Sequence, residues 1–112
     1  MTYQQGDIVF VNFPFDDDAL ASKQRPAIIV GKVRSRIGAY IIAKVTSASR
    51  DDDHSFWLSD ALLSRPMPRL SQVRTNEIQT LSETQILHKF SGLNRTALKE
   101  LCQQIQFNFD VK

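Results

Sequence analysis

Basic side chains are concentrated in one stretch of the 112-residue sequence, and acidic side chains flank that stretch. Positions 19–50 hold seven lysines and arginines and no acid, whereas three consecutive aspartates stand at 16–18 and again at 51–53. Clustered cations of this kind bind the phosphate groups of nucleic acids. An ordinary solvated surface of strands and loops has the same composition, so charge by itself leaves both interpretations open.

Other reactive side chains carry weaker signals. Consecutive aspartates point in different directions and rarely converge on one metal ion. His54 and His88 have no sequence neighbour that marks a catalytic acid or base, and Cys102 falls on an apolar helical stripe typical of a packed thiol. Because the sequence contains no glycine-rich phosphate loop, HExxH or CxxC motif, we expect neither a metal nor another cofactor.

A small fold must position these side chains. A length of 112 residues, with 42% hydrophobic and 23% charged residues, predicts one soluble domain over residues 1–112. No apolar run approaches the ~20 residues of a membrane helix. The N-terminus lacks the pattern of a secretory signal, which predicts a cytoplasmic protein without membrane contact.

The first half of the chain is predicted to contain three strands. β-Branched and aromatic residues favour strands over 7–13, 27–33 and 39–45, and a polar loop is expected over 16–24. The apolar run of the second strand predicts burial on both of its faces. Gly38 marks a turn, so the second and third strands are predicted to form a hairpin.

The second half alternates short elements with polar connectors. We predict a loop over 46–54, a strand over 55–58, a single helical turn over 59–63 and a strand over 71–80. The two prolines of 65–69 have no backbone N–H to donate to the hydrogen-bond ladder of a sheet, so this segment is predicted to be a connector or an edge strand.

The end of the chain is predicted to be helical. Positions 82–85 (Ser-Glu-Thr-Gln) fit a capping box for a short helix, and a short strand or turn is expected at 87–90. Asn94 is a good N-cap, and the buried face of the last helix is predicted at Leu98, Leu101, Cys102 and Ile105. These elements predict a mostly β fold with a C-terminal helix, a compact SH3-like antiparallel barrel.

Four blocks of the sequence resemble the MazF/PemK family of bacterial toxins, whose fold is the CcdB/PemK-like barrel. They are Gly-Asp-Ile-Val-Phe-Val-Asn-Phe-Pro at 6–14, Gln-Arg-Pro-Ala-Ile-Ile-Val at 24–30, Val-Thr-Ser at 45–47 and Ser-Gln-Val-Arg-Thr-Asn-Glu-Ile-Gln-Thr at 71–80. The first two blocks are fairly specific to this family, in which Gly-Asp opens the first strand and Arg-Pro stands at the head of an apolar strand.

The resemblance implies a small homodimeric toxin of a type II toxin–antitoxin pair. Such toxins are sequence-specific endoribonucleases (mRNA interferases) that cut single-stranded mRNA without a metal. The ribose 2′-hydroxyl attacks the adjacent phosphorus and leaves a 2′,3′-cyclic phosphate. A cognate antitoxin would cover the basic groove with an acidic, partly disordered tail.

The resemblance also assigns roles to single residues. Arg25 would donate to the phosphate and stabilise the charge of the transition state, a bidentate task that suits guanidinium. Thr46 would hold a phosphate oxygen through its hydroxyl, and Arg74 matches a second arginine that serves the leaving group or the charge. The remaining predicted RNA contacts are Lys23, Ser47, Arg69 and Asn76.

One departure from the family leaves the general base open. Some relatives have an acid where this chain has Asn76, and an amide cannot take the hydroxyl proton. The base would then be Arg25, an acid of 16–18 or Glu77, or it would be missing. A protein without a base would be a weak or inactive toxin-like protein that binds RNA or an antitoxin.

Two other functions are alternatives. A metal nuclease built on the aspartates would be sensitive to chelators. A CcdB-like, gyrase-binding toxin is disfavoured because the Trp-Gly-Ile of that group is replaced by Phe-Asp-Val-Lys at 109–112.

Overall fold

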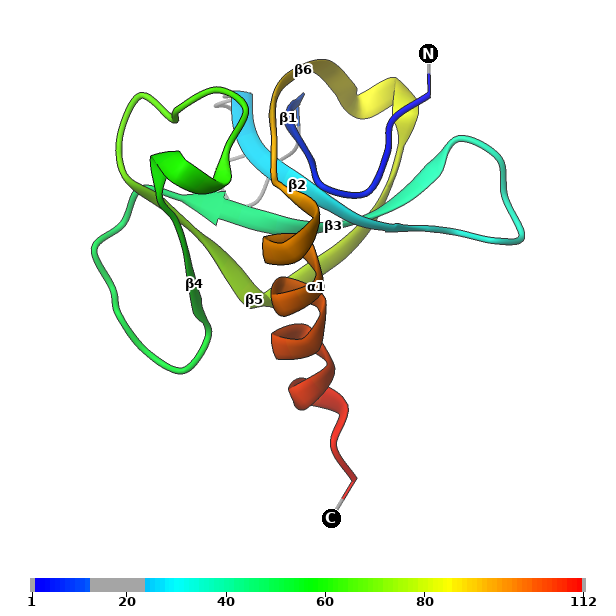
Figure 1. Ribbon diagram of the computed structural model, residues 1–112. Coiled ribbons are helices and arrows are strands. Elements are labelled where there is room, and N and C mark those ends of the chain that lie inside the picture. The colour runs from blue at the N-terminus through cyan, green and yellow to red at the C-terminus, as the bar shows by residue number, and fades with distance from the viewer. Residues whose placement is uncertain (1, 13–23, 112) are drawn as a thin grey trace.

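An antiparallel sheet and a C-terminal helix organise the computed structural model, which describes residues 2–12 and 24–111 (Figure 1). The sheet has six strands in the order β4-β5-β3-β2-β1-β6. The strands are β1 (Asp7–Asn12), β2 (Gln24–Lys32), β3 (Ala39–Thr46), β4 (Ser55–Leu58), β5 (Ser71–Ser82) and β6 (Ile86–Gly92). The helices are α1 (Arg95–Gln106) and three 3₁₀ turns, η1 (Asp60–Leu62), η2 (Glu83–Gln85) and η3 (Phe107–Phe109).

The predicted strands of the first half are confirmed within the described residues. β2 and β3 pair antiparallel and turn at Gly38, whose φ of 80° suits glycine. β2 begins earlier than predicted, so that Pro26 lies inside the strand. Its pairing with β3 begins only at Ala27, and Pro26 therefore has a single partner strand, a position that proline tolerates. Residues 13–23, with most of the predicted polar loop, lie outside the described residues.

The elements of the second half also follow the sequence signals. β4 has the predicted bounds, η1 is the predicted helical turn, and 65–69 is a connector. The capping box at 82–85 is confirmed: the Ser82 hydroxyl accepts from the Thr84 amide at 3.3 Å, and the Gln85 side chain accepts from the Ser82 amide at 3.0 Å. β5 and β6 are each longer than predicted.

The sheet buries apolar side chains on both of its faces. Ile8 and Ile28 join the cluster under α1, whereas their neighbours Val9 and Ile29 join a second cluster on the other face with Tyr3 and Ile86 from outside the central strands. Ala27, Ile28 and Ile29 are each 0% exposed, which confirms the predicted burial of β2. Successive side chains of the central strands thus point into one core and then into the other, instead of alternating between core and solvent.

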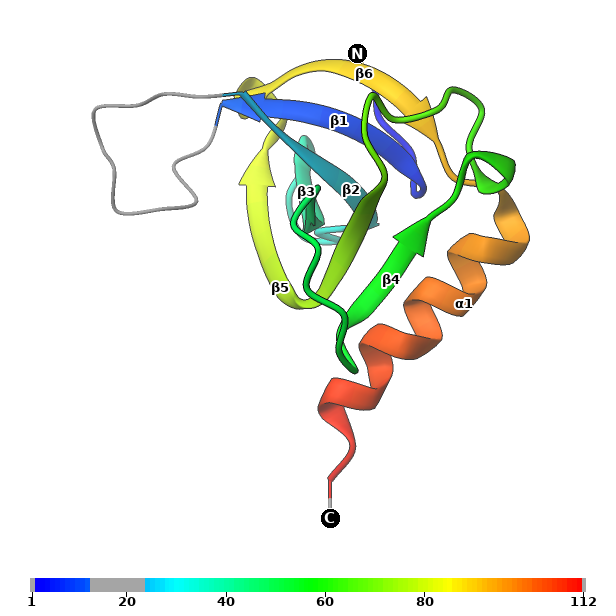
Figure 2. The same cartoon turned by 90° about the vertical axis from the view of Figure 1, so that its left-hand side faces the viewer.

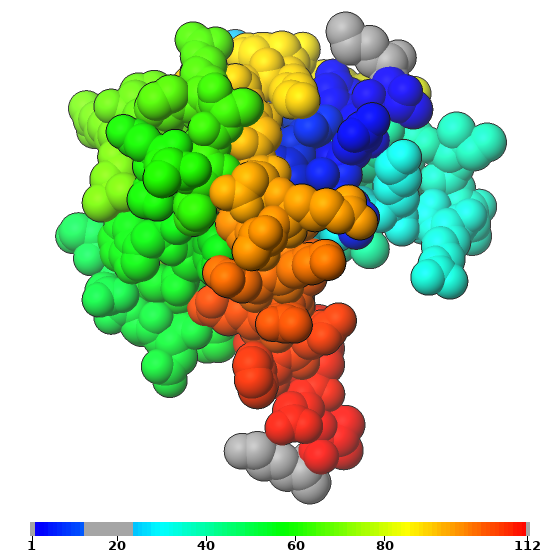
Figure 3. Space-filling model, viewed as in Figure 1, coloured from blue at the N-terminus to red at the C-terminus, as the bar shows by residue number. Residues whose placement is uncertain are grey.

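The helix begins at the predicted cap, where Asn94 accepts from the Ala97 amide at 2.8 Å. Its buried stripe is Ala97, Leu101 and Ile105, whereas Leu98 and Cys102 are half-buried. The predictions for Leu101 and Ile105 are therefore confirmed, and the buried stripe includes Ala97 in place of Leu98 and Cys102. In the space-filling view, α1 lies between β1 and the segment that contains β4, and its C-terminal end projects beyond both (Figure 3).

The predicted mostly β fold with a C-terminal helix is confirmed, and its curled, barrel-like sheet stays open in the described residues. β4 and β6 are its two edges, and only the isolated bridge between Leu63 and Leu93 approaches a closure. Figure 2 shows α1 beside β4, and the Gln104 side chain donates to the carbonyls of Asp53 and Ser55 at 3.2 and 3.1 Å. The helix therefore covers the side that a closing strand would occupy.

A bend in β5 sets the geometry of the polar residues. β5 pairs with β3 at Val73 and again at Ile78, and residues 74–77 between them have no partner in β3. The five residues 71–75 are all buried, so alternation is lost there. No helix in the described residues has the length and hydropathy of a membrane span.

Candidate active site

A pocket of about 420 Å³ lies where β1, β2 and β3 meet the connector before β5. Its position follows from strand register, because Phe10 pairs with Pro26 and Ala27 pairs with Lys44. The lining residues are Phe10, Arg25, Pro26, Lys44, Val45, Thr46, Ser47, Met67, Pro68, Arg69 and Ser71.

The lining combines cations and hydroxyls with apolar groups. Arg25, Lys44 and Arg69 supply positive charge, while Thr46 and Ser47 supply hydroxyl groups. Phe10, Pro26, Met67 and Pro68 form the apolar part of the lining. This mixture suits a ligand that carries both an anion and a flat apolar group, as a nucleotide does with its phosphate and base.

The hydroxyl of Thr46 is held in place at the end of β3. Its Oγ1 accepts a hydrogen bond from the Ala48 amide at 3.2 Å. A threonine hydroxyl has one hydrogen to donate and two lone pairs, so this bond uses a lone pair and leaves the O–H as a donor. Thr46 thus closes a local turn and can also donate to an anion in the pocket.

The structure brings four of the seven predicted site residues together. Arg25, Thr46, Ser47 and Arg69 all line the pocket, although they come from three separate segments. Asn76 is exposed on the bend of β5 and is not part of the lining. Lys23 lies outside the described residues. The catalytic and RNA-binding roles of all these residues stay predictions.

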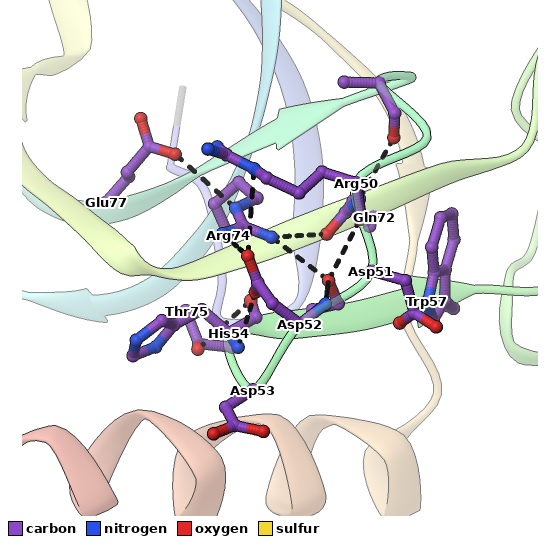
Figure 4. A network of polar contacts seen from close by, with 12 residues as sticks. Arg50, Asp51, Asp52, Asp53, His54, Trp57, Gln72, Arg74, Thr75 and Glu77 are labelled. Atoms are coloured by element: carbon purple, nitrogen blue, oxygen red, sulfur yellow. Dashed lines mark hydrogen bonds and ion pairs between the residues drawn. The ribbon is translucent and has the colours of Figure 1, made fainter.

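Arg74 lies elsewhere, in a polar network beneath the 47–54 loop that follows β3 (Figure 4). Its side chain is only 3% exposed. Nη2 lies 3.0 Å from Asp52 Oδ2, Nη1 donates to Gln72 Oε1 at 2.9 Å and to Ser55 Oγ at 3.0 Å, and Nε lies 3.6 Å from Glu77 Oε2. The predicted catalytic role of Arg74 stays a prediction, and these contacts give it a second interpretation, as a support for the loop.

The network also changes the acidity of one carboxyl group. The pKa of Asp52 lies below its usual value, first because the Arg74 side chain donates to it and then because the His54 amide does. In Figure 4, Asp51 faces Trp57, whose indole N–H donates to it at 3.2 Å, and Asp53 points toward the helix. The three aspartates therefore diverge, and no group of three or more metal-ligating side chains occurs within 2–12 and 24–111.

Two remaining reactive side chains lie away from the hydroxyls of the pocket. Cys102 is half-buried on α1, and burial raises the pKa of its thiol. His88 is exposed on β6 and stacks on Phe10, with ring centroids 5.2 Å apart. Phe10 also meets Phe90 edge to face, with centroids 5.5 Å apart.

Sequence reasoning missed several residues of the pocket. Lys44 had a usable signal, because it stands two positions before Thr46 on one strand and so shares a face with it. Phe10 could have been found from its strand pairing with Pro26. Met67 and Pro68 carry no local signal, since only the tertiary fold brings their connector to the end of β3.

Solved structures of MazF toxins have a similar fold. The fold of this chain is similar to MazE–MazF from Deinococcus radiodurans, with a TM-score of 0.75, 15% identity and coverage of 100% of this chain and 99% of that one. It is similar to an endoribonuclease in complex with its cognate antitoxin from a mycobacterial species (TM-score 0.74, 11% identity, 99% and 98% covered). It is also similar to the Mycobacterium tuberculosis toxin MazF-mt6 (TM-score 0.72, 19% identity, 95% and 98% covered).

A family model agrees with this similarity. The model of the PemK-like, MazF-like toxins of type II toxin–antitoxin systems matches residues 4–109, so the chain belongs to that family. The resemblance seen in the four sequence blocks is thereby confirmed. No curated protein sequence matches the chain significantly.

Proposed function

We propose that this protein, as one toxin domain over residues 1–112, is a metal-independent endoribonuclease that cleaves single-stranded RNA, with mRNA as its cellular target. The observation that carries the proposal is the convergence of Arg25, Thr46 and Arg69 on one pocket, with Lys44 beside them. Family membership supports the reaction class.

The proposed chemistry needs no nucleophile from the protein. The 2′-oxygen of the ribose forms a bond to the adjacent phosphorus, the bond from phosphorus to the 5′-oxygen breaks, and a 2′,3′-cyclic phosphate remains. Arg25 would donate two parallel hydrogen bonds to the phosphate oxygens, and Thr46 would donate one. Both groups stabilise the extra negative charge of the five-coordinate transition state.

One group must take the 2′-proton and another must protonate the departing 5′-oxygen. Among the candidate acids only Glu77 lies in the described residues. Its Oε1 is 3.7 Å from the Nζ of Lys44, which lines the pocket, and its Oε2 is 3.6 Å from Arg74 Nε. Glu77 thus forms an ion pair with Lys44, which lines the pocket, and is our candidate for the general base. Cleavage by Glu77→Gln tests this assignment.

The apolar part of the lining supports a preference among bases. Phe10, backed by His88 and Phe90, offers an aromatic surface next to the cations, and stacking of this kind contributes about 1–3 kcal/mol per base. Lys23, Ser47 and Asn76 are proposed as further RNA contacts that add to recognition.

The deciding experiment is cleavage of a long single-stranded RNA by purified protein in excess EDTA. We expect cuts at a short sequence that end in cyclic phosphate, and losses of about 10²- to 10³-fold in Arg25→Ala and Thr46→Ala. Arg34→Ala and Thr96→Ala, two exposed positions outside the pocket lining, are the matched controls. RNA that stays intact would favour a toxin-like protein that only binds, and cuts that need added metal would point to the aspartates.

We also propose that the protein is a cytoplasmic homodimer with a cognate antitoxin as its partner. Family membership and the antitoxin complexes among similar structures support this. An acidic segment of the antitoxin would compete with RNA for the three cations of the pocket. Light scattering tests the dimer, and an acidic peptide that inhibits cleavage more weakly at high salt would support the competition.

A further inference from the structure

Gln72 is a fully buried polar side chain that the reaction outlined above does not use. It lies on β5, directly opposite Thr46 on β3 and Trp57 on β4, and is 0% exposed. A buried amide is retained only where its hydrogen bonds are made. Its partners therefore indicate what it holds in place.

One end of the Gln72 amide is fixed by Arg74. Arginine has only donors, so the group that faces Arg74 Nη1 at 2.9 Å must be the carbonyl oxygen Oε1. Arg74 is itself held by Asp52 and Ser55, at 3.0 Å each. The amide cannot flip without turning its N–H groups toward a guanidinium.

The other end of the amide holds the 47–54 loop. Nε2 donates to the Ala48 carbonyl at 3.0 Å and also to the Arg50 carbonyl. The Ala48 amide in turn donates to Thr46 Oγ1 at 3.2 Å. Hydrogen bonds thus link Arg74 to Gln72 and Gln72 to the Ala48 carbonyl, and the backbone of Ala48 connects that carbonyl to the amide that donates to Thr46. Figure 4 shows the buried part of this connection.

We propose that Gln72 is a positioning residue for cleavage, which places the Thr46 hydroxyl through Ala48. The proposal rests on the proposed function. Gln72 is buried and does not line the pocket, so it contributes to the reaction only through the groups it orients. The hydrogen bonds of the Gln72 side chain in the described residues go to Arg74 and to two loop carbonyls and not to a cation of the pocket lining, so RNA affinity should be separable from rate.

The test compares cleavage rate with RNA affinity in Gln72→Leu and Gln72→Glu. Leucine removes both hydrogen-bonding ends, whereas glutamate still accepts from Arg74 but cannot donate to the two carbonyls. Affinity is measured with 2′-O-methyl RNA, which has no free 2′-hydroxyl and so cannot be cut. Gln79→Leu, an exposed glutamine on the same strand, is the matched control.

We expect both Gln72 variants to cut about 10- to 100-fold more slowly, while affinity stays within about threefold of wild type. The double variant Gln72→Leu with Thr46→Ala should be about as slow as Thr46→Ala alone, because the two residues act as one unit. Wild-type rates in the Gln72 variants, or losses that multiply in the double variant, would overturn the proposal. Gln72→Glu carries the test should Gln72→Leu fail to fold.

A second readout does not depend on activity. Exchange of the Ala48 backbone amide with deuterium, followed by NMR, should be faster in Gln72→Leu than in wild type or Gln79→Leu. Unchanged exchange would overturn the proposal. Protein that is inert toward RNA in every variant, wild type included, would refute the endoribonuclease, whereas active wild type with a dispensable Gln72 would refute only this inference.

Discussion

Arg25 and Arg74 are the same residue type on two strands of one sheet, β2 and β5, yet their surroundings differ. Arg25 is half-buried at the start of β2 and lines the pocket with two other cations and three hydroxyl residues. Arg74 is buried at the bend of β5, where Asp52, Gln72 and Ser55 accept from its guanidinium. The first environment gathers positive charge around a cavity, and the second neutralises it inside the protein.

We propose that the same side-chain type serves as a catalytic group at Arg25 and as a structural support at Arg74. The Nη1 and Nη2 groups of Arg74 already donate to protein acceptors, and these hydrogen bonds would have to break before either group could donate to an RNA phosphate. On this proposal Arg74 acts through rigidity and Arg25 through charge. Four predictions test this division of roles between Arg25 and Arg74.

The largest expected effect is on the reaction rate at Arg25. Arg25→Lys keeps the charge but loses the fork that donates two bonds, so cleavage should fall about 10²-fold while affinity for uncleavable RNA changes little. Rates are measured under single-turnover conditions, with Arg34→Lys as control. A rate equal to wild type would show that only charge is needed at this position.

Arg74 should affect stability more than rate. Arg74→Ala leaves the Oε1 atom of the buried Gln72 without its donor, and a buried acceptor without a hydrogen bond costs about 1–3 kcal/mol of unfolding free energy. The exposed Arg34→Ala should change it by less than about 0.5 kcal/mol. Urea unfolding measures both. Arg74→Ala that is as stable as wild type but unable to cleave would restore the catalytic interpretation.

Salt dependence should separate the cations of the pocket from those elsewhere. Each phosphate contact contributes about −0.7 to the slope of log affinity against log salt concentration for single strands. Lys44→Ala and Arg69→Ala should each make the slope shallower by about that amount. Lys99→Ala, exposed on α1, should leave it unchanged, and equal slopes in all three variants would argue against a phosphate site in the pocket.

The smallest expected effect is the pH dependence carried by Asp52. Its pKa is lowered in the folded protein, so its stabilising contribution is present above about pH 4 and is lost as the pH falls through the lowered pKa. Asp52→Asn should therefore lower Tm more at pH 7 than at pH 2.5, with Asp51→Asn as a comparison. An equal change in Tm at both pH values would mean that the carboxylate charge plays no part.

Local signals predicted most of the fold because they depend on near neighbours. The capping box at 82–85, the cap at Asn94 and the strand over 55–58 are set within a few residues, and the structure has all three. The open sheet was not predicted, since closure depends on where α1 packs. That packing is a tertiary contact without a local pattern.

The candidate site was predicted only in part, for a reason that lies in β5. In a regular strand Gln72, Arg74 and Asn76 would share one face, and a basic face with an amide would suit RNA. The bend at 74–77 breaks this alternation, so Arg74 is buried and Asn76 is exposed. Bends and bulges depend on pairing with distant strands, which spacing along the chain does not encode.

Trp57 gives the 47–54 loop a spectroscopic label of its own. It is the single tryptophan of the chain, lies across from Gln72 and donates its indole N–H to Asp51. Indole emission responds to hydrogen bonding and solvent, so the tryptophan fluorescence of the unmodified protein reports on β4 and on the loop that contacts it. Rearrangement of the loop when RNA or an antitoxin binds can therefore be followed in real time, without an added dye.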